Sequence, residues 1–148
     1  MSAGRRWVAP VTFALAIAGA GVSGYLTIVH YTSSKLLACV STGVINCERV
    51  TTSAQSEVFG IPVALLGLLW FVAMVGLCSP WAWRSPARWV SIARQAAVWS
   101  GMAFVLWLVY AELFVIDAIC LWCTVVHVLA FGLFVIVVMY GWGTAEEA

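Results

Sequence analysis

Four long apolar stretches constrain this chain more than any other feature of its sequence. They run from about 7 to 30, 61 to 78, 92 to 116 and 120 to 142. A helix needs about 20 mostly apolar residues to cross the hydrocarbon layer of a bilayer, and only the second stretch is shorter than that. Because 64% of the residues are hydrophobic and only 9% are charged, a water-soluble fold is excluded. The sequence also lacks the basic patch that binding to nucleic acid requires.

We therefore predict an all-α fold: an integral membrane four-helix bundle that forms a single membrane domain over residues 1–148, with a long outer loop over 31–60. Lys and Arg gather on the cytoplasmic side of membrane proteins. Of the seven Lys and Arg residues, the four spans put five on one side: Arg5, Arg6, Arg84, Arg88 and Arg94. The other side holds only Lys35 and Arg49. Both termini are thus expected in the cytoplasm.

The first span is expected to be retained rather than cleaved as a signal peptide. Its apolar run exceeds the roughly 7–15 residues of a signal-peptide core. Ala16, Ala20 and Gly24 recur at every fourth position, and such a stripe of small residues allows a neighbouring helix to approach closely.

Four of the five cysteines fall on the outer side of this topology. Cys39 and Cys47 lie in the outer loop, and Cys120 and Cys123 open the fourth span. Cys78 alone falls at the cytoplasmic end of the second span, where we expect a buried, inert thiol. Disulfides form and persist outside the cytoplasm, so the outer cysteines are candidates for disulfide chemistry.

The motif "CLWC" at 120–123 has the spacing of a redox centre. At a helix N-terminus the backbone N–H groups favour a negative charge, which predicts a lowered pKa for the first thiol, Cys120. Cys123 lies one turn deeper, toward the hydrocarbon. The loop pair, in "CVSTGVINC", is eight residues apart and rich in turn-forming residues. A mobile pair beside an anchored pair can pass electrons by thiol–disulfide exchange.

Three other interpretations of these cysteines remain open at this point. They are two structural disulfides, four ligands of a tetrahedral zinc, or, for the "CLWC" pair, buried packing residues. The corresponding alternative function is a non-catalytic membrane scaffold whose outer loops are held by disulfides. A covalent haem site is excluded because Thr124, not His, follows the second cysteine of the motif.

With these features the sequence resembles the vitamin K epoxide reductase family in its bacterial form, without a fused thioredoxin-like domain. The resemblance rests on the four spans, on the order of the cysteine pairs, and on "NCERVTTS", "FGIPVALLG" and "YAELFVIDAICLWC", and it covers roughly residues 10 to 140. The four-span quinone-linked disulfide oxidases carry their two cysteine pairs in the opposite order, so they are not the match.

The resemblance implies roles for individual residues. Cys39 and Cys47 are similar to the family's loop cysteines, which exchange with a thioredoxin-like partner, with Cys39 facing the partner and Cys47 passing electrons to Cys120. Cys120 and Cys123 resemble the active-site pair, with Cys123 beside the quinone. Ser53 matches a loop serine and is a candidate to cap a short helix that covers the site.

Two positions depart from the animal enzymes of the family. His127 stands where they have a Tyr near the quinone, one turn below Cys123 on the same helix face. An ionisable side chain at that depth is a candidate ligand of the quinone, or else a histidine bonded to a neighbouring helix. The animal enzymes also bind the quinone through an Asn of the second span, whereas the only Asn here is Asn46 in the loop. Quinone reduction is therefore expected rather than epoxide reduction.

The resemblance as a whole implies a quinone-dependent, disulfide-forming enzyme of the bacterial plasma (inner) membrane, with its active site on the extracytoplasmic side. Its expected partners are membrane lipid, a quinone (menaquinone or ubiquinone) and a separate thioredoxin-like periplasmic or extracytoplasmic oxidant. Glu112, Asp117 and His30 near the outer surface are expected to be solvated, because burying a charge in a membrane is costly. Tyr25, Trp107 and Tyr110 are either pocket or packing residues.

Overall fold

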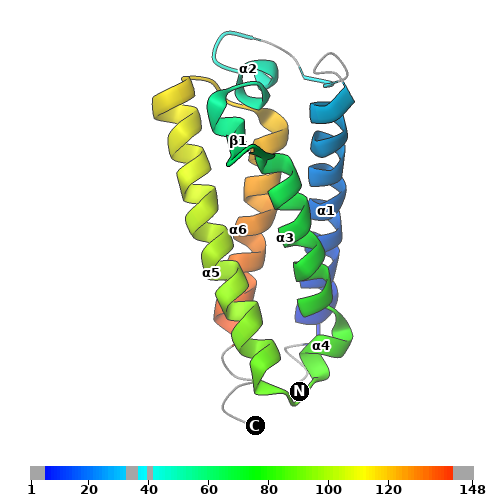
Figure 1. The fold of residues 1–148 in the computed structure, drawn as a ribbon. Coiled ribbons are helices and arrows are strands. Elements are labelled where there is room, and N and C mark those ends of the chain that lie inside the picture. The colour runs from blue at the N-terminus through cyan, green and yellow to red at the C-terminus, as the bar shows by residue number, and fades with distance from the viewer. Residues whose placement is uncertain (1–5, 33–36, 40–41, 142–148) are drawn as a thin grey trace.

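The computed structural model describes residues 6–32, 37–39 and 42–141. Four helices run side by side as a bundle (Figure 1). They are α1 (Val8–Thr32), α3 (Val63–Leu77), α5 (Arg88–Tyr110) and α6 (Leu121–Gly141), and a π-helical segment, η4 (Ala111–Ile116), continues α5. Each helix lies within a few residues of a predicted span. The all-α membrane class predicted from the sequence is therefore confirmed.

The helix α3 is shorter than predicted, at 15 residues. Among the described residues, three helices are long and apolar enough to cross a membrane, namely α1, α5 with η4, and α6. The residues before α3 instead form a hairpin, in which β1 (Glu57–Val58) pairs antiparallel with β2 (Ile61–Pro62). Phe59 and Gly60 at its turn have φ values of 54° and 77°, as the favoured two-residue hairpin turn requires.

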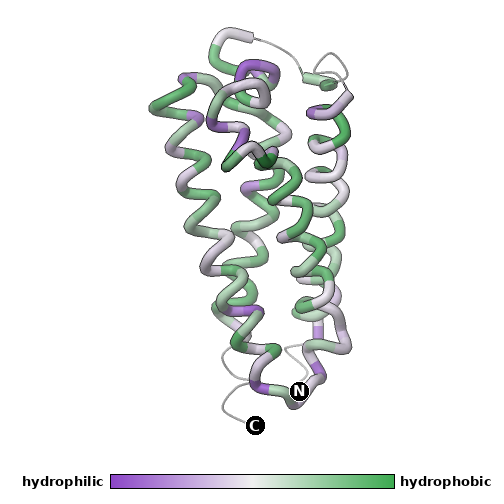
Figure 2. Tube along the Cα trace, viewed as in Figure 1, coloured by the Kyte–Doolittle hydropathy of each residue, from purple (hydrophilic) through white to green (hydrophobic). Residues whose placement is uncertain are grey.

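The short elements mark the two ends of the bundle. Next to the hairpin lie α2 (Cys47–Thr51) and η3 (Ala54–Ser56), whereas α4 (Pro80–Arg84) lies at the opposite end, where α1 begins and α6 ends (Figure 1). Figure 2 shows hydrophobic colouring along most of the helices and hydrophilic colouring around α2 and the hairpin. The arrangement places the two cysteine-bearing segments, α2 and the start of α6, at the same end.

Small residues let the helices approach closely. A Cβ atom on Gly19 of α1 would lie 2.1 Å from a ring carbon of Phe71 in α3, and one on Gly101 of α5 would lie 2.4 Å from the indole of Trp70. Ala16 of the predicted stripe is fully buried, and Gly24 faces Leu68 of α3. The stripe is therefore part of the contact between α1 and α3.

The α4 end of the bundle is held by a buried arginine rather than by a surface charge. Arg94 is only 1% exposed, although the sequence suggested a charge flanking the membrane. Its Nε donates to the carbonyl of Leu77 at 2.8 Å, and its guanidinium lies 3.8 Å from the ring centroid of Trp83. A cation at the carboxyl end of a helix is favoured by the helix dipole, so Arg94 stabilises the end of α3. Cys78 beside it is fully buried, as predicted.

Candidate active site

The "CLWC" motif lies at the start of α6, as expected. Cys120 immediately precedes the helix, and its Sγ accepts the backbone N–H of Cys123 at 3.3 Å. Its carbonyl accepts the N–H of Thr124 at 2.9 Å. Cys120 is fully buried and Cys123 is half-buried. The Cys120 sulfur thus occupies the place of a helix-capping acceptor, where N–H groups point toward it.

The environment of Cys120 favours its thiolate. A hydrogen bond from the Cys123 thiol lowers the pKa of Cys120 below its ordinary value, and backbone N–H groups act in the same direction, whereas burial opposes them. The net direction agrees with the pKa predicted from the motif's position at the helix start. Cys120 is therefore the thiol better suited to react with a disulfide.

The loop pair forms a disulfide held directly against this motif. Cys39 and Cys47 are joined, with their Cα atoms 6.2 Å apart. The loop pairs with the residue before Cys120, since Asn46 N–H donates to the carbonyl of Ile119 at 3.1 Å and Ile119 N–H donates to Val44 at 2.9 Å. The side chains of Cys47 and Cys120 belong to the same buried cluster. Because two of the four sulfurs are bonded to each other, they are not available as zinc ligands.

A tryptophan inside the motif holds the other end of the loop pair. The Trp122 indole N–H donates to the carbonyl of Ala38 at 3.0 Å, and the N–H of Ala38 donates to the Tyr25 hydroxyl at 3.2 Å. The rings of Trp122 and Tyr25 contact each other with centroids 5.2 Å apart. Ala38 directly precedes Cys39, so these contacts fix both loop cysteines near the start of α6. Tyr25 is thus a packing residue and not part of the cavity described next.

A cavity of about 350 Å³ lies below the motif and reaches Cys123, His127 and Ser53. Its walls come from α1, α3, α5, η4 and α6, and from the segment between α2 and the hairpin. Most of its lining is apolar, including Trp70, Phe71, Phe104 and Leu108. This volume and this mixture of apolar surface with a few polar groups are typical of a small-molecule site.

His127 is buried in the cavity wall, one turn below Cys123. Within the described part of the chain, its side chain makes no hydrogen bond and no ion pair. The interpretation of His127 as a residue bonded to a neighbouring helix therefore has no support in the described contacts. Its imidazole is free to bond a ligand in the cavity.

Glu112 is a second ionisable group in the cavity wall, and the expectation that it is solvated was wrong. It is 7% exposed and lines the cavity. The π-helical turn of η4 explains its position, because such turns shift the following side chains around the helix axis. The turn ends at Asp117, which has φ of 54° and is exposed, as expected.

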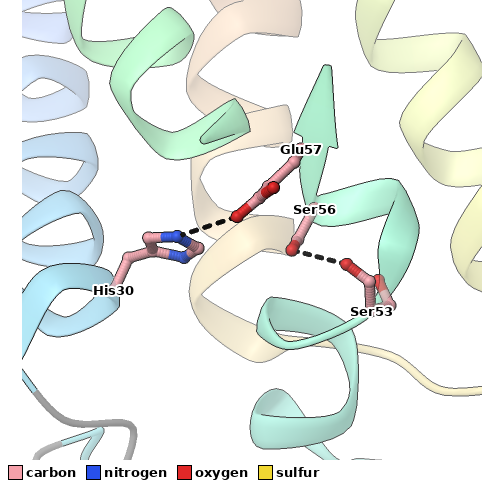
Figure 3. Close-up of polar contacts among 4 residues, drawn as sticks. All are labelled: His30, Ser53, Ser56 and Glu57. Atoms are coloured by element: carbon pink, nitrogen blue, oxygen red, sulfur yellow. Dashed lines mark hydrogen bonds and ion pairs between the residues drawn. The ribbon is translucent and has the colours of Figure 1, made fainter. Parts of the chain in front are cut away.

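A short polar segment between α2 and the hairpin lines the cavity, and Figure 3 shows the contacts of its Ser53 and Ser56. The Ser53 hydroxyl donates to the carbonyl of Val50 at 2.8 Å, and the Ser56 hydroxyl donates to the carbonyl of Ser53 at 2.6 Å. Ser53 precedes η3 but makes no side-chain capping bond, and Asn46 caps α2 instead. His30, expected to be solvated, lies 3.5 Å from the Glu57 carboxylate and connects α1 to the hairpin. Ser53 and Ser56 both line the cavity.

The sequence profile described as the vitamin K epoxide reductase family matches residues 10–138. The match spans most of the chain and includes nearly all of α1, the loop disulfide, the cavity and the "CLWC" motif.

Proposed function

The chain belongs to the vitamin K epoxide reductase family, whose members are membrane thiol oxidoreductases, and from this premise we propose that it reoxidises a thioredoxin-like, disulfide-forming partner and reduces a membrane quinone. The observation that carries the proposal is the position of the Cys120 and Cys123 pair between the loop disulfide and the cavity. Cys120 shares a buried cluster with Cys47 of the loop disulfide, and Cys123 lines an apolar cavity.

The electrons move in three exchanges, each balanced. The partner's two thiols become a disulfide as the Cys39–Cys47 disulfide becomes two thiols. Cys47 then attacks the oxidised Cys120–Cys123 pair through a mixed disulfide, which restores the loop disulfide and leaves two thiols at the start of α6. Those thiols close to a disulfide again and deliver two electrons and two protons to the quinone, which becomes a quinol.

Different residues of the cavity act on different parts of the quinone. Cys123 supplies the sulfur nearest the quinone, and His127 and Ser53 contribute to binding its polar head. His127 and Glu112 are the ionisable groups of the cavity wall, so they are the candidates to carry protons between the thiols and the quinone oxygens. The quinone is menaquinone or ubiquinone. The site faces the extracytoplasmic side of a bacterial plasma membrane, where the partner is a separate protein.

The test is quinone reduction by the protein in lipid nanodiscs, with a reduced thioredoxin-like protein as electron donor and quinone absorbance as the signal. Cys123→Ala removes the thiol that closes the disulfide, so turnover is expected to fall by about 10²-fold or more. Cys78→Ala is the matched control, because Cys78 is buried near Arg94 at the opposite end of the bundle. It is expected to keep the original rate.

The same assay separates the cavity residues from one another. His127→Phe is expected to raise the KM for quinone, and Glu112→Gln to lower kcat and alter its pH profile with little change in KM. An unchanged KM in His127→Phe assigns that residue to packing. If Cys123→Ala turns over at the original rate, the redox mechanism is wrong and the disulfides are structural.

A further inference from the structure

A buried serine hydroxyl of the cavity has no hydrogen-bond partner among the described residues. The Ser23 side chain on α1 is 1% exposed, it lines the cavity, and its Oγ makes no hydrogen bond within the described ranges. The neighbouring hydroxyls of α1 behave differently, since Thr12 and Thr27 donate to carbonyls one turn earlier, at 2.8 and 2.7 Å. Buried hydroxyls are nearly always bonded, so an exception requires an explanation.

The opposite helix leaves room for this hydroxyl. A Cβ atom on Gly67 of α3 would lie 3.4 Å from the Ser23 Oγ, and Gly67 lines the same cavity. Because glycine has no side chain, no group of α3 at this position bonds or covers the Ser23 hydroxyl on the cavity side. It is placed to donate to an acceptor in the cavity.

Ser23 and His127 line the same cavity from two different helices, α1 and α6. Gly67, which lies beside Ser23, lines it from α3. A para-quinone has carbonyl acceptors at opposite ends of a small ring, which suits donors from two different helices.

We propose that the Ser23 hydroxyl donates a hydrogen bond to the quinone carbonyl that lies away from Cys123 and His127. This inference rests on the proposed function and adds a residue of α1 that fixes the orientation of the ring. The quinone is then held at both carbonyls, one by α6 and one by α1, with its reactive end at Cys123.

The test compares Ser23→Ala with Thr27→Val. Thr27 lies one turn away on the same helix, but its hydroxyl already donates to the carbonyl of Ser23 at 2.7 Å and it does not line the cavity. The loss of one neutral hydrogen bond is expected to raise the KM for a short-tail ubiquinone about three- to tenfold in Ser23→Ala, with kcat at saturation nearly unchanged. Thr27→Val is expected to match the unmodified protein.

Infrared spectra of the bound ubiquinone give a readout that does not depend on turnover. Each carbonyl has its own stretching band, and the loss of a hydrogen bond moves that band to higher frequency. Ser23→Ala is expected to shift one band, and that band must differ from any band shifted by His127→Phe. An unshifted spectrum in Ser23→Ala, or a shift of the same band as in His127→Phe, overturns the inference.

These measurements separate the inference from the proposed function. Turnover by the unmodified protein together with an unchanged KM and spectrum in Ser23→Ala contradicts the Ser23 contact alone. Quinone that binds with the expected band shift but is never reduced contradicts the proposed function and supports the contact.

Discussion

At the scale of single residues, the two cysteines of the "CLWC" motif have different surroundings because Cys120 precedes α6 and Cys123 lies in its first turn. Cys120 stands before the helix and accepts the backbone N–H of Cys123, whereas Cys123 stands inside the first turn and reaches the cavity. The same backbone that favours charge on the first sulfur therefore points the second toward an apolar ligand. The difference in chemistry between the thiols follows from where the helix begins.

The pKa of Cys120 gives a prediction with a definite sign. The pKa is lowered first by the Cys123 thiol, so the Cys120 thiolate persists down to a lower pH than that of an ordinary cysteine. Cys123→Ala removes the donor, so the pKa of Cys120 is expected to rise, because a charge-assisted hydrogen bond to the thiolate is lost. Cys123→Ser supplies a hydroxyl donor and is expected to keep most of the lowering.

The measurement is the ultraviolet absorbance of the thiolate as a function of pH, taken as the difference from Cys120→Ser. The Cys39–Cys47 disulfide stays intact throughout, so it does not titrate. A midpoint that is the same in Cys123→Ala and Cys123→Ser would show that the side chain at 123 has no influence on Cys120.

The sequence predicted those site residues that belong to spaced motifs. The two cysteine pairs, Ser53 and His127 all carry such a signal, and all lie at one end of the bundle around the loop disulfide and the cavity. The sequence did not identify Ser23 and Glu112 as site residues, because a serine in a span is common and a carboxylate near an interface is usually solvated. Glu112 lies in a π-helical segment, and Ser23 lies opposite a glycine of another helix. Neither feature can be predicted from the spacing of residues in the sequence.

At the scale of elements, helix contacts were predicted better than helix lengths. The small residues of α1 do meet α3, because small side chains act through proximity alone. The start of α3 was misplaced because Ile61 and Pro62 are as apolar as the helix that follows them, whereas the hairpin depends on the backbone of Phe59 and Gly60. Hydropathy reports burial in lipid or protein and does not distinguish a short strand from a helical turn.

Gly19 provides a stability prediction for the α1–α3 contact. Gly19→Ala would place a methyl group 2.1 Å from Phe71, which is 1% exposed and cannot move aside freely. Overpacking of this kind is expected to lower the free energy of unfolding by about 1–3 kcal/mol. Gly21→Ala is the control, since nothing lies within 4 Å of a Cβ atom at that position. Reversible unfolding in mixed detergent micelles should show that Gly21→Ala is as stable as the unmodified protein or slightly more stable. An equal loss of stability in both variants would rule out the close contact with Phe71 as the cause.

At the scale of the whole molecule, the bundle separates two kinds of polar group. The end near α4 has one buried cation, Arg94, bound to a helix terminus and a tryptophan. The other end has the disulfide, the cavity and the ionisable groups that face it. In the part of the chain that the structure describes, the groups of the candidate site therefore lie at one end, and the proposed mechanism requires that end to face the compartment where disulfides persist.

The proposed mechanism predicts which end of the bundle faces the cytoplasm. Arg84 and Arg88 flank the link between α4 and α5, and an excess of such charges is expected on the cytoplasmic side. The test places single cysteines at Thr52 and at Trp81, which are exposed at opposite ends of the bundle, in a chain whose own cysteines are replaced by serine. A membrane-impermeant maleimide applied to bacterial spheroplasts is expected to label Thr52→Cys at once and Trp81→Cys only after the membrane is broken. The reverse order would put the disulfide and cavity in the cytoplasm, where reducing systems keep thiols reduced, and a role in forming disulfides for an extracytoplasmic partner would then be untenable.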